Sequence, residues 1–321
     1  MQIALGCHSR ATLCYPLAMP ATCSLSVVID RTREALAAAD LYYGHGTDNP
    51  HDEACWLVSA TLGLPPDFSD QTDRAVSAEE QAQIEALVAE RISTRKPLAY
   101  LLGEAWFAGL RFEVDESVLV PRSPLAELIV EGFSPWLEES RWSRAVEIGT
   151  GSGCIAAALA WHHPHCQVDA LDISPNALAV AQRNIAALGV AQRVRLMESD
   201  LWAAVADQRY DLIIANPPYV PEASMVGLPA EYLAEPSLGL VAGADGLRLV
   251  KPLLLQAFAH LNPGGIVVLE VGEAADALEE WLHQFGVGPV WLEFAYGGDG
   301  VCVLDNAACE QLSRQGGKIT D

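Results

Sequence analysis

The sequence has few basic side chains for its length. It holds 19 Lys and Arg against 42 Asp and Glu in 321 residues, which gives a formal net charge of −23. Proteins that bind nucleic acid through its phosphates rely on lysine and arginine to displace counterions, and helices that lie on membrane surfaces are rich in the same residues. The charge therefore disfavours both classes and favours a partner that is itself basic.

Long apolar runs and paired cysteines are also missing. No uninterrupted apolar run reaches the roughly 18–20 residues of a membrane span, and the eight cysteines form no Cys-x-x-Cys pair. Residues 1–24 lack the basic start and unbroken apolar run of a signal peptide, and we interpret them as a disordered or additional lead. We therefore expect free buried thiols, a cytoplasmic location and no membrane contact.

The pattern of apolar residues changes along the chain. Helical spacing over residues 25–98 predicts a small helical domain, and strand-like residues around Gly109 predict a β-hairpin within residues 99–121. A helix is expected over residues 124–136. Over residues 122–310 short strands alternate with helices, which indicates an α/β domain with a parallel sheet covered on both faces and a terminal hairpin. Residues 311–321 are interpreted as a tail.

A glycine-rich turn follows the first strand of the α/β domain, in Glu147-Ile148-Gly149-Thr150-Gly151-Ser152-Gly153. Alternate glycines between a strand and a helix let the backbone turn sharply and approach a ligand closely. A dinucleotide site would carry G-x-G-x-x-G, whereas the tighter G-x-G-x-G without a basic neighbour suits a ligand that lacks phosphates. A turn that binds no ligand is the alternative.

Acidic positions follow the next two strands. Asp172 comes 19 residues after Gly153, the spacing at which a carboxylate accepts two hydrogen bonds from a ribose diol. Its alternative role, capping the following helix, can be served by Ser174 instead. In residues 198–202 an acidic side chain can accept a hydrogen bond from the amino group of an adenine while Leu201 packs on the ring. A helix cap explains that segment equally well.

The most specific motif is Asn216-Pro217-Pro218-Tyr219, directly after an apolar strand. Two prolines cannot continue strand pairing and make a rigid corner. The Asn216 side-chain oxygen and the Pro217 carbonyl can bind both hydrogens of an –NH2 group and so orient its lone pair, as a weakly nucleophilic nitrogen requires. Tyr219 offers a flat face for a planar group. The motif therefore favours chemistry at a planar nitrogen over a plain proline turn.

A histidine-rich segment does not fit a metal site. Its candidate ligands are His162, His163, His165 and Cys166. They all lie at the end of one helix, interrupted by Pro164, whereas a structural zinc site usually takes two separated ligand pairs that face each other. We therefore predict no metal. His45, in a glycine-bounded turn, is interpreted as a surface or packing residue.

Together these motifs resemble those of class I methyltransferases that use S-adenosylmethionine. Adenine-N6 DNA methyltransferases and protein-glutamine N5 methyltransferases share the Asn-Pro-Pro-Tyr motif. The helical N-domain, the hairpin and the linker Pro121-Arg122, without an inserted recognition domain, resemble the glutamine group over about residues 25–305. The resemblance implies a Rossmann-like, mostly parallel seven-stranded sheet with a C-terminal hairpin, next to a small N-terminal helical domain.

Two branches of the glutamine group differ in the linker. Release-factor methyltransferases have Pro-Arg-Pro-Asp-Thr-Glu, whereas this chain has the longer Pro121-Arg122-Ser123-Pro124-Leu125-Ala126-Glu127. Residues 43–49 and 228–236 resemble the branch that methylates a glutamine of large-subunit ribosomal protein three. The implied substrate is thus a basic ribosomal protein, free or in an assembling large subunit. Release-factor methylation, adenine methylation of DNA and cofactor binding without catalysis are the alternatives, and the charge disfavours direct DNA binding.

The resemblance also implies roles for individual residues. The expected catalytic residues are Asn216, Pro217 and Tyr219. The expected cofactor-binding residues are Gly149, Thr150, Gly151, Ser152, Gly153, Asp172, Asp200, Leu201 and Asn216. Related enzymes often carry a stacking aromatic at the position of Leu201. Glu147 and Glu235 are further candidates for a negative field that suits a sulfonium, and no metal is implied.

Overall fold

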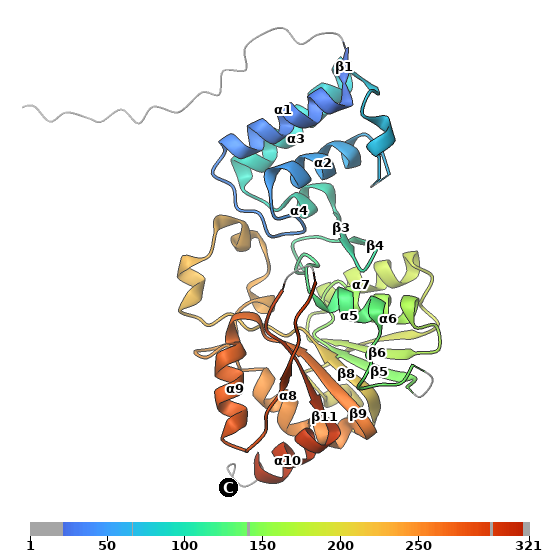
Figure 1. Cartoon of the computed structure of the whole chain (residues 1–321), viewed down its shortest axis with the longest axis vertical. Helices are drawn as coiled ribbons and strands as arrows, with labels where there is room; N and C mark the ends of the chain where they lie inside the picture. Colours follow the sequence, from blue (N-terminus) through green and yellow to red (C-terminus); the bar gives the residue numbers. More distant parts are fainter. Residues whose placement is uncertain (1–21, 66, 140–141, 296–297, 317–321) are drawn as a thin grey trace, which may run out of the picture.

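The computed structural model describes residues 22–65, 67–139, 142–295 and 298–316, so most of the expected lead lies outside the described residues. Figure 1 shows a helical N-terminal part above a larger α/β part, with a small hairpin between them. Among the described residues, no helix is long and apolar enough to cross a membrane.

The N-terminal part is a small helical bundle with a two-stranded sheet. Its elements are β1 (Thr22–Ser24), α1 (Leu25–Ala38), α2 (Pro50–Thr61), η1 (Ser69–Gln71), β2 (Ala75–Ser77), α3 (Ala78–Thr94) and α4 (Leu98–Leu102). A capping box begins α3: Ser77 Oγ accepts from the Glu80 N–H, and Glu80 accepts from the Ser77 N–H. Such a cap typically stabilises a helix by about 1 kcal/mol.

Two expectations at the ends of the chain are corrected. Residues 22–24, assigned to a disordered or additional lead, are ordered: they form β1 and pair with β2. Residues 311–316, expected to be tail, belong to α10 (Asn306–Gly316), because Cys309 and Leu312 bury an apolar stripe against the sheet. The buried cysteines are free thiols, as expected, and burial raises the pKa of Cys302 and Cys309 to about 12.

A hairpin links the two parts. It consists of β3 (Glu104–Phe107) and β4 (Leu110–Glu113), and Ala108 and Gly109 turn the chain with φ of 51° and 76°. Residues 114–124, which follow β4, form no strand. The helix expected over residues 124–136 is α5 (Leu125–Glu131), because Gly132 takes φ of 86° and ends it.

The α/β part is built on one seven-stranded sheet with the order β10-β11-β9-β8-β5-β6-β7. Its strands are β5 (Arg144–Ile148), β6 (Gln167–Asp172), β7 (Val194–Glu198), β8 (Tyr210–Ala215), β9 (Leu261–Glu270), β10 (Val290–Trp291) and β11 (Val301–Asp305). Strands β5 to β9 pair in parallel, and β10 and β11 are antiparallel. The predicted mostly parallel sheet with a C-terminal hairpin is therefore confirmed.

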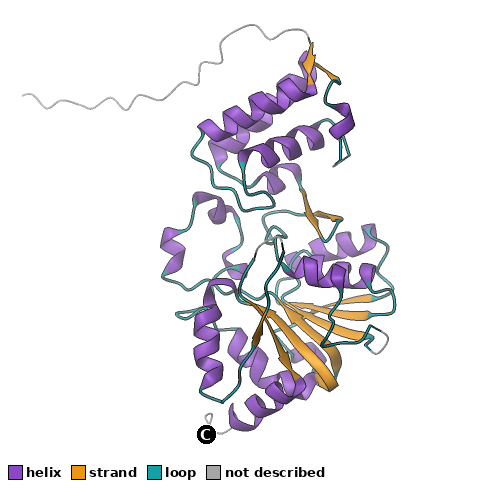
Figure 2. Cartoon of the chain, in the orientation of Figure 1, coloured by secondary structure: helices purple, strands orange, loops and turns teal. Residues whose placement is uncertain are grey.

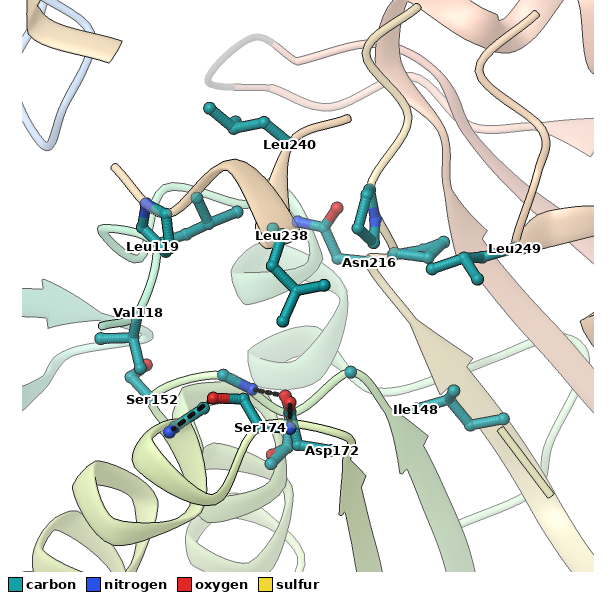
Figure 3. A pocket seen from close by; sticks show the side chains of 18 of the residues that line it. Val118, Leu119, Ile148, Ser152, Asp172, Ser174, Asn216, Leu238, Leu240 and Leu249 are labelled. Carbon is teal, nitrogen blue, oxygen red and sulfur yellow. Dashed lines mark hydrogen bonds between the residues drawn. The ribbon is translucent and has the colours of Figure 1, made fainter. Parts of the chain in front are cut away.

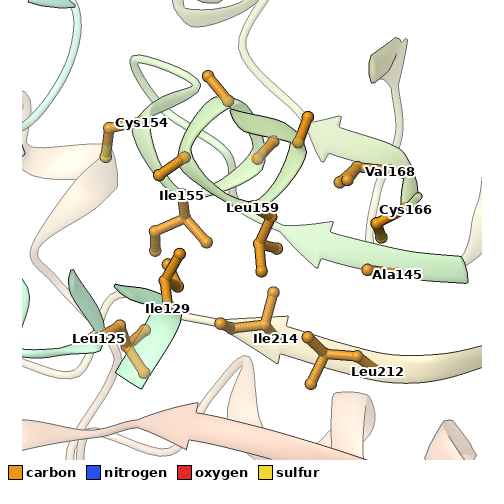
Figure 4. Close-up of a cluster of buried hydrophobic side chains, with 14 of the residues drawn as sticks. Leu125, Ile129, Ala145, Cys154, Ile155, Leu159, Cys166, Val168, Leu212 and Ile214 are labelled. Atoms are coloured by element: carbon orange, nitrogen blue, oxygen red, sulfur yellow. The ribbon is translucent and has the colours of Figure 1, made fainter. Parts of the chain in front are cut away.

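Helices cover both faces of this sheet (Figure 2). The remaining helices are α6 (Cys154–His162), α7 (Pro175–Ala187), α8 (Val250–Ala257), α9 (Ala275–His283), and the 3-10 helices η2 (Ala203–Val205), η3 (Ser224–Gly227), η4 (Ala230–Ala234), η5 (Ser237–Gly239), η6 (Phe258–His260) and η7 (Gly272–Ala274). Helices α5, α6 and α7 share one core with the sheet, and α8, α9 and α10 share the other. Figure 4 shows the first core, where Leu159 of α6 faces Leu212 and Ile214 of β8.

A buried ionic network joins the N-terminal part to the α/β part. Arg91 of α3 is 1% exposed and binds Glu53 at 2.9 Å and Glu231 of η4 at 3.3 Å. Arg95 also binds Glu231, at 2.9 Å, and the Tyr42 N–H donates to the same carboxylate. Opposite charges that are buried together satisfy one another, so removing one partner leaves an uncompensated charge.

Replacing Arg91 with methionine should destabilise the protein, because Glu53 would keep a buried carboxyl group without its cation and Glu231 would keep only Arg95. We expect Arg91→Met to lower the free energy of unfolding by about 3–5 kcal/mol, measured by urea unfolding. The matched control is Arg33→Met on α1, whose partners are exposed, and it should change stability by about 0.5 kcal/mol or less. Equal losses in the two variants would contradict this account.

Candidate active site

A cavity of about 820 Å³ lies at the carboxyl ends of the parallel strands. The loops after β5, β6, β7 and β8 form one wall, and linker residues 117–123 with several residues between 228 and 240 form the other. Figure 3 shows Leu119, Leu238 and Asn216 on one side of the space and Asp172 and Ser174 on the other. Its volume suits a small-molecule cofactor.

Most of the residues predicted for the site meet in this cavity. The predicted residues that line it are Gly149, Thr150, Gly151, Ser152, Asp172, Asp200, Leu201, Asn216, Pro217 and Tyr219. Gly153 is the exception, because it caps α6 and packs against α7: a Cβ there would lie 2.9 Å from the Cβ of Ala181. Its missing side chain permits close helix packing rather than ligand contact.

The glycine loop is held by hydrogen bonds to the neighbouring strand. Gly149, Gly151 and Gly153 have φ of 78°, 53° and 78°, values that favour glycine. The Gly149 and Thr150 N–H groups donate to the Leu171 carbonyl at 2.8 and 2.9 Å. The loop backbone thereby runs along the cavity wall with no side chain at Gly149 and Gly151.

Asp172 lies at the end of β6 beside this loop. Its two carboxylate oxygens accept from the N–H groups of Gly151 and Ser174, each at 2.8 Å. The following helix is capped by Ser174, whose hydroxyl accepts from the Ala177 N–H at 3.3 Å. Burial raises the pKa of Asp172, while the backbone hydrogen bonds oppose that rise. Each oxygen keeps a lone pair for a ligand hydroxyl.

Glu147 and Glu235 do not supply a free negative charge. Glu147 is buried and accepts hydrogen bonds from the Thr150 hydroxyl at 2.5 Å and the Ala156 N–H at 2.9 Å. Burial raises the pKa of Glu147 to about 8, so its carboxyl group is mostly neutral at pH 7. Burial alone would raise the pKa of Glu235, but His45 and Arg122 lower it to about 2. Arg122 binds Glu235 at 2.6 and 2.8 Å and neutralises it.

The segment after β7 brings Asp200 and Leu201, which were predicted to lie near an adenine, to the cavity. Leu201 lines the cavity with a φ of 46°, and Asp200 beside it is exposed. Trp202 turns away into the core, where it stacks on His260 at 4.1 Å and donates to the Leu253 carbonyl. Leu201 is therefore the apolar residue that this segment offers to the cavity.

The Asn216–Tyr219 corner follows β8 and packs on two glycines. A Cβ at Gly246 would lie 2.4 Å from the Tyr219 carbonyl oxygen, and one at Gly272 would lie 2.6 Å from Tyr219 Cε2. The Tyr219 hydroxyl donates to Glu270 at 3.5 Å. Burial raises the pKa of Tyr219, so it remains a neutral phenol.

Two residues at the cavity, Glu270 and its hydrogen-bond partner Ser123, were not predicted from the sequence. Glu270, the last residue of β9, lines the cavity and is 5% exposed. The Ser123 hydroxyl donates to it from the linker. Nothing local marked this pair, because the two residues lie 147 positions apart in the chain.

The histidines contact protein groups rather than forming a metal site. His163 contacts Glu139 at 2.8 Å and the Ile129 carbonyl at 2.9 Å, and His162 contacts the Ala108 carbonyl. Within the described ranges, no group of three or more His, Cys, Asp or Glu side chains could hold a metal ion. His45 is buried, packs edge-on against Tyr232, and its Nε2 lies 3.4 Å from Glu235 Oε2, so it is not a surface residue.

Each of the two parts of the chain matches a known protein-family model. The PrmC N-terminal domain model matches residues 29–103, and the Methyltransferase small domain model matches residues 128–233. The ribosomal protein uL3 glutamine methyltransferase of Bordetella pertussis is 45% identical over 87% of this chain and 92% of its own length. The enzyme of the same name from Xanthomonas campestris pv. campestris is 44% identical over 92% of this chain and 96% of its own length. The chain belongs to the ribosomal protein uL3 glutamine methyltransferase family.

A solved structure shows the same fold. The hMettl16 catalytic domain in complex with MAT2A 3'UTR hairpin 6 aligns with a TM-score of 0.50 and 16% identity, over 77% of this chain and 91% of that chain. The chain is therefore a methyltransferase of the uL3 glutamine methyltransferase family by sequence, on a fold shared with that catalytic domain. The family implies S-adenosylmethionine as the methyl donor.

Adding a methyl group at Gly272 should displace the Tyr219 ring. We expect Gly272→Ala to lower the free energy of unfolding by about 1–3 kcal/mol more than Gly264→Ala, because of overpacking. Gly264 is the matched control: its φ is 80°, and a Cβ there meets nothing within 4 Å. Equal losses, measured by urea unfolding, would show that Tyr219 has room to move.

Proposed function

We propose that this chain transfers a methyl group from S-adenosylmethionine to the side-chain amide nitrogen (N5) of a glutamine in ribosomal protein uL3. The observation that carries the proposal is the Asn216–Tyr219 corner, which shares one cavity with the glycine loop and Asp172. The relatives named for this reaction support it, since they are 44–45% identical and cover nearly the whole chain.

The cavity residues fit S-adenosylmethionine, which would supply an electrophilic methyl group on a sulfonium. The loop residues 149–152 would hold its methionine part, and the remaining lone pairs of Asp172 would accept from the ribose hydroxyls. Asp200 and Leu201 would lie near the adenine. The fit rests on the side-chain-free approach at Gly149 and Gly151 and on the cavity-facing carboxylate of Asp172. No metal is needed for this chemistry.

The corner after β8 would hold the glutamine. The Asn216 side-chain oxygen and the Pro217 carbonyl would accept both amide hydrogens, and Tyr219 would pack against the amide plane. An amide nitrogen is a weak nucleophile because its lone pair is delocalised, so holding both hydrogens and aiming the lone pair lowers the barrier. The transfer is direct and forms no covalent bond to the enzyme.

The charge suits a basic protein substrate. A net charge of −23 would attract a ribosomal protein and repel DNA. We infer that the helical N-terminal part selects this partner, either free or in an assembling large subunit. Such a substrate is in keeping with a cytoplasmic enzyme that makes no membrane contact.

The direct test uses purified uL3. Incubation with the enzyme and methyl-labelled S-adenosylmethionine should place N5-methylglutamine on uL3, detected by mass spectrometry of its peptides. Release factor and duplex DNA are tested in parallel as competing substrates. Label on a release-factor glutamine or on adenine, with none on uL3, would overturn the proposal.

Two variants should separate methyl transfer from cofactor binding. Asn216→Ala should lower transfer about 100-fold or more, because the amide loses an orienting acceptor, while calorimetric affinity for S-adenosylmethionine is kept. Asp172→Ala should weaken that affinity about 10-fold or more through loss of charge-assisted hydrogen bonds. Asp207→Ala, at an exposed position, is the matched control. Loss of cofactor affinity in Asn216→Ala would assign Asn216 to the cofactor instead.

A further inference from the structure

The cavity wall that faces the glycine loop carries exposed apolar side chains. Residues 222–240, which include η3, η4 and η5, form part of this wall and are the gold loop below the helical part in Figure 1. The three most exposed large hydrophobic side chains of the described residues all lie in this segment: Val226 at 93%, Leu233 at 74% and Leu238 at 56%. We call these three residues the apolar rim. Scattered exposed apolar residues are ordinary, whereas a group of them in one place indicates an interaction site.

Burial around η4 is the reverse of the usual pattern. Glu231 and Glu235 are 0% and 5% exposed, whereas Leu233 between them is 74% exposed. Both carboxylates are held by arginines. The segment is therefore fixed by ion pairs, and packing within the chain does not account for a leucine on its outer side. A polar residue would serve there equally well if nothing bound to that side.

The apolar rim is continuous with the cavity. Leu238 lines the cavity, and so does Tyr232, the chain neighbour of Leu233. Figure 3 shows Leu238 on the same side of the cavity as Asn216, with Asp172 on the other side. The proposed contacts to the ribose and to the methionine part of the cofactor lie on that other side. The rim therefore borders the space that is left for the glutamine.

The same segment also touches the helical part. The ring of Tyr42, which is 39% exposed, lies 5.6 Å from the ring of Tyr232, and the Tyr42 N–H donates to Glu231. A polypeptide that lies along the apolar rim would therefore contact both parts of the molecule while its glutamine enters the cavity.

The exposed charges near the rim are mostly acidic. Asp200 and Glu273 are exposed and line the cavity, together with one exposed arginine, Arg248. Glu222, at the start of the segment, is exposed as well. An apolar surface with acidic neighbours suits a polypeptide that carries apolar and basic side chains, and it does not suit a nucleic acid or an anionic lipid surface.

We propose that the apolar rim is the docking surface for the substrate polypeptide, and that it binds an apolar side chain close to the glutamine that is methylated. The proposal rests on the proposed glutamine methylation and names the part of this chain that holds the substrate next to the Asn216–Tyr219 corner. The rim contacts neither the amide nor the methyl group, so it acts on substrate binding and not on the transfer step.

The first test is Leu233→Ser, assayed with uL3 as the substrate. We expect KM for uL3 to rise about 10-fold, because the burial of one leucine side chain is lost. The value of kcat and the affinity for S-adenosylmethionine should stay unchanged, since the lost contact is the same in the bound and transition states. Val226→Ser should shift KM in the same direction. The matched control is Val130→Ser on α5, a valine that is 52% exposed, and it should change none of these values.

The second test identifies what the rim binds. Leu233→p-benzoylphenylalanine places a photo-crosslinking side chain in the rim, and irradiation should join it to uL3 at or beside the peptide that holds the methylated glutamine. Val130→p-benzoylphenylalanine should give no such product. An unchanged KM in Leu233→Ser, or a cross-link to a second copy of this chain in place of uL3, would overturn the inference. A cross-link to uL3 that carries no N5-methylglutamine would overturn the proposed function alone.

Discussion

The site depends on one constraint: parallel strands all end at the same edge of the sheet. In this chain β5 leads into the glycine loop, β6 ends at Asp172, β8 leads into Asn216, and β9 ends at Glu270. The chain first builds the sheet outward from β5 to β7 and then returns to place β8 on the other side of β5. At that reversal the loops diverge and leave a crevice, which is where ligands bind in sheets of this kind.

Buried ion pairs hold the second wall of this crevice in place. Glu231 binds Arg91 and Arg95 of the helical part, and Glu235 binds Arg122 of the linker. Both glutamates lie in the segment that faces the glycine loop across the cavity. The same ion pairs therefore join the two parts of the molecule and set the shape of the site, so that a protein held by the helical part would meet a cavity already formed.

Local motifs were predictable because the chemistry they carry is local. The glycine loop, Asp172 and the Asn-Pro-Pro-Tyr corner each combine a strand end with a few adjacent residues, and all three line one cavity. The predicted mostly parallel sheet is also confirmed. Gly153 was assigned to the cofactor because glycine loops and close helix packing give the same sequence pattern, and only the contact with Ala181 separates them.

The sequence by itself determined the kinds of element, their order and the position of the Asn216–Tyr219 corner, since periodicity and turn chemistry act over a few residues. Tertiary structure decided the state of the buried acids. Glu147 is a mostly neutral acid near its loop, Glu235 is neutralised by Arg122, and Glu270 meets Ser123 from 147 positions away. Burial and distant partners set the charge of a carboxyl group, and neither can be read from its neighbours in the chain.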